Sequence, residues 1–491
     1  MRALPLLCKL LPALLSLLLS SACDAEPPEQ GSYSADAVRQ DFDALYEGLK
    51  ASHFDLFAHR SKEEYDALYA DMRRAIAAPM TRTDAEVYFQ KFAAYGNVAH
   101  ANIAFPSAAY EAFRAGAGRA FPLLIRFIGD DLMVYQDMSG AASSLGGARI
   151  FSINGESAEA IEKRLSAHLS ADNQYLSRTM LEFRFGQLLW LEFGEVEAFT
   201  LGVETPEGER RSVSVRALAR GALVDSNEPV FELDWNERRY EIIDGVGYLR
   251  PGPFYNNAPD AADMWDNAAF KAFIDEAFET FITEDVPDVL IDLRANPGGD
   301  NSFSDLMIAW FADRPFKFAS HFYVKVSEAT IASNAKRLRP GDATSTSARF
   351  ARAFEKAKLG DVIDFDLGES APREGERYKG SVAMLIDRHS YSNTVTVAAL
   401  AQDYGFATIL GEETSDLATT YGAMETFSLP NTGIEVGFPK AHIIRPNGSL
   451  EARGVIPDIA IAEPLRSRED DMLKEALRLI GRDLGAKEER Q

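Results

Sequence analysis

Residues 288–301 read Asp-Val-Leu-Ile-Asp-Leu-Arg-Ala-Asn-Pro-Gly-Gly-Asp-Asn, and this stretch decides the fold. Its apolar run, 289–293, is typical of a short buried strand. The run stops at Pro297-Gly298-Gly299, where two glycines allow positive φ angles and a close approach of the backbone. N–H groups freed in such a turn can point at one place, as they do in an oxyanion hole. Because an ordinary strand-to-helix turn has the same pattern, the rest of the chain must decide between the two interpretations.

Strands and helices alternate on both sides of this turn. Further strands are predicted at 246–249, 381–386, 407–410, 425–429 and 435–438, and helices at 268–283, 304–312 and 393–404. Such alternation predicts an α/β core, which we place at residues 230–465.

Two regions precede the core and one follows it. Residues 34–110 carry apolar side chains at helical spacing and predict a helical domain. Residues 115–225 contain β-type runs and the strand end Ile153-Asn154-Gly155, which predict a β-rich binding module. Residues 466–491 are expected to form a C-terminal amphipathic helix and tail.

The first 22 residues have the pattern of a secretory signal peptide: a basic start, an apolar middle and small residues before the cleavage site. Cys23 stands where a bacterial lipoprotein carries its lipidated cysteine, although Ser20 replaces the usual leucine. Residues 23–33 form a polar tether. We therefore expect a bacterial cell-envelope or periplasmic protein with a lipid anchor at Cys23, with plain secretion as the alternative.

Composition excludes several classes of function. The 491 residues carry a net charge of −24, which argues against binding to nucleic acid or anionic lipid. Cys8 and Cys23 are the only cysteines, and Cys8 lies in the signal peptide, so no cysteine nucleophile or thiolate metal site is expected. The histidines show no metal-ligand spacing and no phosphate-binding glycine motif is present, so we expect no metal and no other cofactor. The sequence gives no indication of an oligomeric state.

A second strand-to-helix junction carries a candidate nucleophile. The strand at 381–386 leads into His389-Ser390-Tyr391-Ser392 and then into a helix of small and apolar residues. A serine at a helix N-terminus lies near the positive end of the helix dipole and near free N–H groups. The alternative is that Ser392 caps the helix, the commonest role of serine at this position.

The order of these motifs resembles peptidase family S41, the tail-specific or C-terminal processing proteases. The resemblance continues downstream in Gly411-Glu412-Glu413-Thr414, in 429–433 (Leu-Pro-Asn-Thr-Gly) and in 454–458 (Gly-Val-Ile-Pro-Asp), and it covers residues 245–462 most strongly. It implies a crotonase/Clp-protease-like α/β core, an N-terminal helical domain and a PDZ-like domain. It also implies an enzyme that cleaves peptide or protein substrates.

The resemblance assigns Ser392, rather than Ser390, as nucleophile. The oxyanion hole would consist of backbone N–H groups of Gly298 or Gly299 and of Asn393. The family's processing proteases carry a lysine about 25 residues after the serine, but position 417 is leucine.

Without that lysine the serine needs another base. His100 matches the histidine of the tricorn-like branch, although its turn reads Gly-Asn-Val-Ala-His instead of Gly-Asp-x-His. Glu451 matches the branch's relay glutamate. A Ser392–His100–Glu451 set fits acyl-enzyme chemistry, in which histidine takes the proton and an anion orients the imidazole.

Other interpretations remain open at this point. His389 is a competing base, and His100 and Glu451 could be a packed histidine and a solvated carboxylate. Asp292 and Arg294 are expected to form structural ion pairs. We predict a serine endopeptidase, and the alternative is an inactive protein of the same fold that binds peptide or an apolar ligand, as the interphotoreceptor retinoid-binding proteins do.

Overall fold

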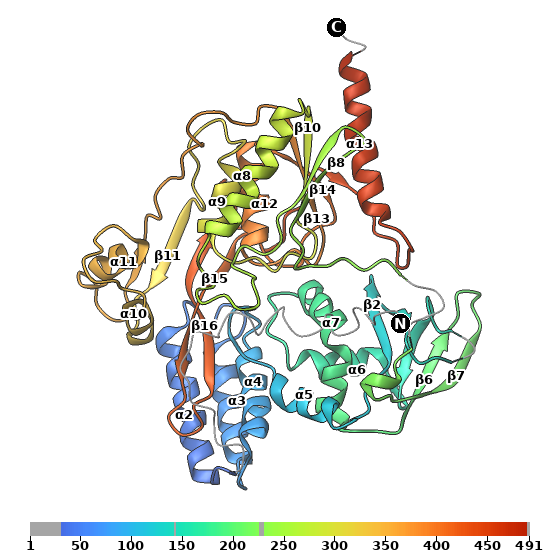
Figure 1. Cartoon of the computed structure of the whole chain (residues 1–491). Coiled ribbons are helices and arrows are strands. Elements are labelled where there is room, and N and C mark those ends of the chain that lie inside the picture. The colour runs from blue at the N-terminus through green and yellow to red at the C-terminus, as the bar shows by residue number, and fades with distance from the viewer. Residues whose placement is uncertain (1–30, 142–143, 225–229, 489–491) are drawn as a thin grey trace. The chain divides into compact units, whose positions relative to one another are not determined.

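The computed structural model describes residues 31–141, 144–224 and 230–488 (Figure 1). The predicted signal peptide, Cys23 and most of the tether lie outside the described residues. The chain forms two compact units. One contains residues up to Pro229 together with Lys325–Arg337 and Ala423–Lys440, and the other contains Val230–Val324, Leu338–Gly422 and Ala441 onward. The expected core at 230–465 is therefore interrupted, because two of its segments belong to the first unit.

The first unit begins with three helices, α2 (Ala35–Ser52), α3 (Lys62–Ala75) and α4 (Arg82–Ala94). Ser61 and Thr81 cap α3 and α4 in reciprocal capping boxes, which fixes where both helices begin. Stacked and edge-on aromatic rings around Phe42 fill the space between them. The helices predicted in residues 34–110 are present, and they share one compact unit with the β-rich part.

Two segments from far along the chain complete this helical part. Leu429, Ile434, Val436 and Phe438 belong to the same buried cluster as the residues of α2 and α4. The strand β16 (Glu435–Ile444) pairs there with β1 (Asn102–Ile103), and β15 (Thr420–Ser428) is another neighbour of β16. The end of β16, from Ala441, belongs to the second unit, where it pairs with β11 (His321–Lys325). Asp41 accepts hydrogen bonds from the Asn431 and Thr432 N–H groups, both at 2.8 Å. α10 (Glu328–Ala335) also lies in this unit.

The rest of the first unit is β-rich, as predicted, while its PDZ-like character stays a prediction. Its antiparallel sheet has the order β2-β3-β4-β6-β7, and β5 pairs with β4. The strands are β2 (Leu123–Ile128), β3 (Asp131–Asp137), β4 (Arg149–Ile153), β5 (Glu156–Ser157), β6 (Ala198–Glu204) and β7 (Arg210–Arg216). The accompanying helices are α5 (Ser107–Ala115), α6 (Ala158–Ser166), α7 (Gln174–Phe193) and the short 3-10 turn Arg220–Ala222.

The second unit is built on a largely parallel sheet with the order β17-β14-β13-β10-β9-β8. Its strands are β8 (Arg239–Ile243), β9 (Val246–Arg250), β10 (Asp288–Asp292), β13 (Ser381–Ile386), β14 (Thr408–Gly411) and β17 (Ile459–Ala460). Only β8 pairs in antiparallel fashion. All five residues of β10 are buried, which explains its continuous apolar pattern. The α/β fold class is confirmed.

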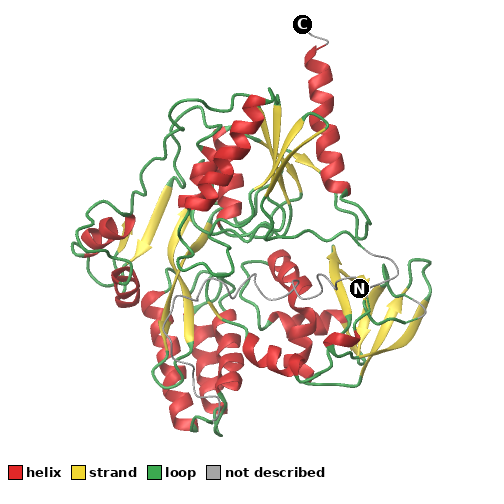
Figure 2. Ribbon diagram, viewed as in Figure 1, coloured by secondary structure: helices red, strands yellow, loops and turns green. Residues whose placement is uncertain are grey.

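Helices cover both faces of this sheet (Figures 1 and 2). α8 (Ala268–Thr283), α9 (Asn301–Ile308) and α12 (Asn393–Tyr404) form one large apolar cluster with the first face. α13 (Asp471–Glu488) packs Met472, Leu473 and Ala476 against the other face. α9 begins three residues before its predicted start because the Asp300 side chain accepts the Ser302 N–H. The unit also contains α11 (Thr346–Phe354) and β12 (Val362–Asp364).

In the described part of the chain, no helix is both long and apolar enough to cross a membrane.

His53 is a buried titratable side chain that makes the stability of the first unit depend on pH. It is fully buried, and Lys325 Nζ donates to its carbonyl oxygen at 2.7 Å. Burial, followed by the positive charge of Lys325, lowers the pKa of His53 to about 3. The folded protein therefore holds His53 neutral across a pH range in which the unfolded chain protonates it.

We predict that acid weakens folding through His53 from about pH 6.5 downward. The pKa of the histidine in the unfolded chain is about 6.5, so as the pH falls the unfolded state binds a proton before the folded state does. This lowers the free energy of unfolding by about 2 kcal/mol at pH 5. Urea unfolding at pH 7, 6 and 5 should show a smaller loss of stability for His53→Asn than for the wild-type chain. Equal losses of stability in the two proteins would show that His53 is not the source of the pH dependence.

Candidate active site

The register of two neighbouring parallel strands brings the two motifs together. Asp288 to Asp292 of β10 pair with Ser381 to Leu385 of β13. Both strands therefore end at the same edge of the sheet, where ligand sites of parallel sheets form. The turn at 295–299 follows one strand and the loop at 387–392 follows the other.

Hydrogen bonds tie this turn to this loop. Ala295 N–H donates to Asp387 Oδ1 at 3.0 Å, and Tyr391 N–H donates to the Asn296 carbonyl at 3.0 Å. The Ser390 hydroxyl donates to the Leu293 carbonyl at 2.9 Å and is fully buried. Ser390 thus fixes the loop, and its hydroxyl is occupied by this hydrogen bond.

Ser392 has a conformation that is rare for a residue with a side chain. Its φ is +55° and its ψ is −124°, and its side chain makes no capping hydrogen bond to α12. The capping interpretation is therefore wrong in this structure. Such backbone strain concentrates at functional sites, where the surrounding structure holds it in place.

The Pro-Gly-Gly turn packs directly against Ser392. At Gly298, with a φ of +90°, an added Cβ would lie 2.9 Å from Ser392 Cβ and 2.8 Å from Asn393 N. At Gly299 an added Cβ would lie 2.1 Å from the Phe254 carbonyl oxygen. Both positions therefore need glycine for a close backbone approach.

The backbone donors near Ser392 are not equivalent. Gly298 N–H donates to Asn296 Oδ1 at 3.0 Å, so that donor is occupied. The N–H groups of Gly299 and Asn393 have no hydrogen-bond acceptor among the described residues. Asn393 is further fixed by its side chain, whose Nδ2 lies 3.1 Å from Ser304 Oγ. Of the predicted oxyanion donors, Gly299 and Asn393 are the two that remain available.

Asp416 is a residue of this site that the sequence analysis missed. Its Oδ2 accepts the Ser392 N–H at 2.7 Å and its Oδ1 accepts the Leu417 N–H at 2.9 Å. The side chain is fully buried. One sequence signal could have pointed to Asp416: it immediately precedes Leu417, the position at which the family resemblance expects lysine. Both carboxylate oxygens bind backbone donors, so Asp416 holds the backbone of Ser392.

His389 pairs with a neighbouring carboxylate. Its Nδ1 lies 3.5 Å from Asp387 Oδ2, and both side chains are buried. Burial alone would raise the pKa of Asp387, but the hydrogen bond and charge of His389, with the Ala295 N–H and Arg294, hold that pKa well below its usual range. Asp387 is therefore an anion that serves both the turn and His389.

Asp292 and Arg294 form structural ion pairs, as predicted. Arg294 lies 2.8 Å from Asp292, and its guanidinium also bonds both carboxylate oxygens of Asp470, at 2.8 and 2.7 Å. Arg250 lies 3.3 Å from Asp292. Burial opposes the charge on Asp292, but the two arginines outweigh it and lower its pKa. This network joins the end of β10 to the start of α13.

Glu451 lies in the same unit as Ser392, on an exposed loop. Its side chain is 67% exposed, and Arg453 Nη1 is 3.9 Å away. The loop contacts the segment that contains Asp416 and Leu417: the Ala418 N–H donates to the Arg453 carbonyl, and the Thr419 hydroxyl donates to the Ser449 carbonyl. The structure thus places Glu451 beside the segment where the lysine is missing.

His100 lies in the other unit, in the turn predicted at 96–100, and its side chain is buried. The turn lacks the aspartate of the family pattern, but Asp172 supplies a carboxylate from elsewhere in the chain. Its Oδ2 accepts the Ala99 N–H at 3.1 Å. Sequence spacing could not reveal this hydrogen bond, because 73 residues separate the two partners.

Among the described residues, no group of three or more histidine, cysteine, aspartate or glutamate side chains could hold a metal ion.

The model of Peptidase family S41 matches residues 246–461, a range that includes Gly298, Gly299, Ser392 and Glu451. Among solved structures, mature CPAF is similar with a TM-score of 0.61 at 16% identity, over 87% of this chain and 92% of that chain. Mature CPAF complexed with lactacystin gives a TM-score of 0.59 at 16% identity, over 87% and 94%. These identities show a shared fold. No curated protein matches the sequence.

The glycine turn yields a stability prediction. We expect Gly298→Ala to lower the free energy of unfolding by about 3 kcal/mol, because strain at positive φ adds to contacts with fixed backbone atoms. Gly360→Ala is the matched control: it has the same φ of +90° and open space around an added Cβ. It should cost only about 1 kcal/mol. Urea unfolding of both variants measures the difference, and equal losses would show that contact with the Ser392 loop is unimportant.

Proposed function

This chain belongs to peptidase family S41 and is a peptidase, and from that premise we propose that it is a serine endopeptidase with Ser392 as its nucleophile. One observation carries the proposal: the Ser392 hydroxyl does not cap its helix, and the strained residue is held against the glycine turn. A serine used for helix capping needs no positive φ and no facing pair of glycines.

The proposed reaction follows acyl-enzyme chemistry. Ser392 Oγ attacks the peptide carbonyl, and the negative charge that develops on the carbonyl oxygen is stabilised by the N–H groups of Gly299 and Asn393. His100 takes the hydroxyl proton and returns it to the leaving amine. Glu451 stabilises the imidazolium that forms. Water then attacks the acyl-enzyme and releases the second product.

Ser392 and Ser390 can be separated by chemistry. We expect a fluorophosphonate probe to label the wild-type chain and to lose labelling in Ser392→Ala, because the probe bonds only to an activated hydroxyl. His100→Ala and Glu451→Gln should slow labelling and peptide cleavage together. Ser390→Ala, checked for folding by circular dichroism, is the matched control: it removes a hydrogen bond that holds the loop, so it should slow labelling without abolishing it.

Each contrary result has a defined meaning. Labelling that persists in Ser392→Ala would exclude this nucleophile. Normal labelling in His100→Ala with loss in His389→Ala would transfer the role of base to His389. A wild-type chain that is neither labelled nor cleaves peptides would favour the inactive, ligand-binding alternative.

We further predict that Asp416→Asn slows probe labelling about tenfold or more while the protein stays folded. Asparagine has one acceptor oxygen where Asp416 has two in use, so one of the N–H groups of Ser392 and Leu417 loses its partner. The labelling rate and the kcat and KM of peptide cleavage are measured well below the unfolding temperature. We expect kcat to fall while KM changes little.

Asp403→Asn is the matched control for this variant. Asp403 lies near the other end of α12 and bonds Arg445 at 2.7 Å, so its loss affects stability alone. Equal effects of the two variants on the labelling rate would mean that Asp416 has only a structural role.

A further inference from the structure

The segment Pro251–Tyr255 follows β9 and lies beside the glycine turn of the candidate active site. β9 pairs with β10 in parallel, so both strands end at the same edge of the sheet. Phe254 N–H donates to the Gly298 carbonyl at 2.8 Å, and Asp300 N–H donates to the Phe254 carbonyl at 2.9 Å. Phe254 is therefore bonded to the backbone on both sides of Gly299, with which it forms a parallel bridge.

The first of these two bonds fixes the direction of a proposed oxyanion donor. The Gly298 carbonyl and the Gly299 N–H belong to one planar trans peptide group, so they point in opposite directions. Because the Gly298 carbonyl accepts from Phe254, the Gly299 N–H is turned away from Phe254. A shift of Phe254 would therefore rotate the N–H that the proposed reaction uses to stabilise negative charge.

The sequence leaves this segment few backbone donors that could hold it in place. Pro251 and Pro253 have no N–H, so neither can extend the ladder of hydrogen bonds between β8 and β9. The carbonyl oxygens of the segment are the backbone groups that remain. Arg238 immediately precedes β8, and the antiparallel register that pairs Arg239 with Arg250 brings Arg238 beside Pro251.

The Arg238 guanidinium binds three of these carbonyl oxygens. Its Nε donates to Pro251 at 3.1 Å, and its Nη2 donates to Pro253 at 2.8 Å and to Tyr255 at 2.6 Å. Within the described residues, Arg238 makes no ion pair with a carboxylate. Burial lowers its pKa to about 10, so it is charged at neutral pH. A planar fork of charged donors suits this task better than lysine, which is a single point charge.

We infer that Arg238 is a positioning residue of the oxyanion hole: its three hydrogen bonds keep Phe254 against Gly298 and thereby keep the Gly299 N–H in its direction. The inference rests on the proposed function, because it gives that N–H a role in the proposed reaction. Arg238 acts through the segment and does not need to touch the substrate.

Arg238→Gln tests this role in the proposed reaction. Loss of one oxyanion donor costs about 100-fold or more in kcat, so for a displaced donor we expect kcat and the rate of fluorophosphonate labelling to fall about tenfold or more. KM should change little. The pH profile of kcat/KM should keep its shape, because the proposed base His100 and its partner Glu451 are untouched.

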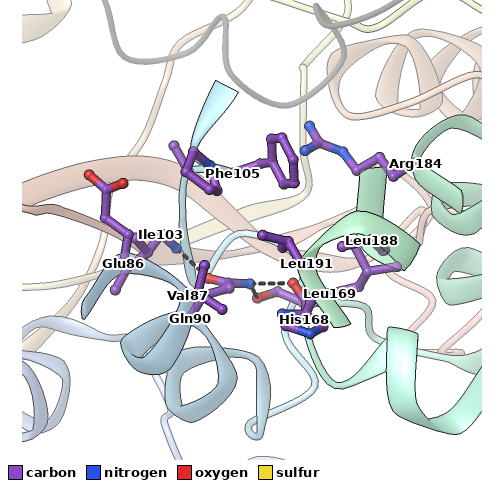
Figure 3. A pocket seen from close by; sticks show the side chains of 13 residues that line it. Glu86, Val87, Gln90, Ile103, Phe105, His168, Leu169, Arg184, Leu188 and Leu191 are labelled. Atoms are coloured by element: carbon purple, nitrogen blue, oxygen red, sulfur yellow. Dashed lines mark hydrogen bonds between the residues drawn. The ribbon is translucent and has the colours of Figure 1, made fainter. Parts of the chain in front are cut away.

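Two other arginines supply matched controls. Arg239→Gln removes the same charge from the next residue, whose side chain is 42% exposed. Arg184→Gln alters a partly buried arginine of α7 in the first unit, which points toward Phe105 in Figure 3 and lies 5.6 Å from the centre of that ring. Arg238 lies 5.1 Å from the centre of the Phe270 ring, so this control matches its ring contact. Neither control should change kcat or the labelling rate.

Hydrogen exchange, followed by mass spectrometry, measures the positioning without any activity. In Arg238→Gln the amides of Phe254 and Asp300 should exchange about tenfold faster or more, because the segment that they join to the turn is released. Both controls should exchange like the wild-type chain. If the wild-type chain is neither labelled nor cleaves peptides, the proposed function fails, and hydrogen exchange still decides whether Arg238 holds the turn.

Three results would each overturn the inference. They are unchanged exchange in Arg238→Gln, faster exchange with unchanged kcat and labelling, and a rise in KM that accounts for the whole loss of kcat/KM. Circular dichroism checks that the variant is folded. If Arg238→Gln does not fold, Arg238→Lys, which keeps the charge without the fork, should show the same pattern with a smaller loss.

Discussion

The candidate active site depends on the hydrogen bonds that join the turn after β10 to the loop after β13. Parallel pairing of the two strands aligns their ends, and Ser390, Asp387 and Tyr391 then bond the facing turn at three points. With both backbones fixed, Gly298 can lie against Ser392 Cβ, and any side chain there would occupy that space. The strained φ of Ser392 persists because the surrounding bonds over-determine it.

Buried carboxylates support this arrangement, and each acts through a different partner. Asp292 pairs with Arg250 and Arg294, Asp387 accepts the Ala295 N–H, and Asp416 accepts the Ser392 N–H. A buried anion with one partner removed would be strongly unfavourable, so these contacts fix one backbone geometry. Leu417 occupies the position where the family resemblance expects lysine, and the structure places the Asp416 carboxylate in contact with the backbone N–H of Ser392. In the proposed mechanism the N–H groups of Gly299 and Asn393 stabilise the developing charge, and the proton acceptor is a residue other than lysine.

The two units contribute differently to the proposed chemistry. The second unit supplies the nucleophile, the glycine turn and Glu451, and the family match falls within residues 246–461. The first unit supplies His100 in a turn that Asp172 holds across a long stretch of sequence.

Because apolar periodicity and the positions of glycines are local signals, the sequence predicted the α/β core, α8 and α12 with their observed ends, and a buried strand at 289–293, which the structure places one residue earlier, at 288–292. It also pointed to Ser392 and to the Pro-Gly-Gly turn through the order of motifs. Only the tertiary structure showed that Ser392 does not cap its helix, that Gly298 N–H is occupied, and that Asp416 and Asp172 bond the two candidate loops. It also moved residues 325–337 and 423–440 out of the expected core. These facts depend on contacts between residues far apart in the chain and on backbone angles. Neither the contacts nor the angles produce a local pattern in the sequence, so the sequence alone could not predict them.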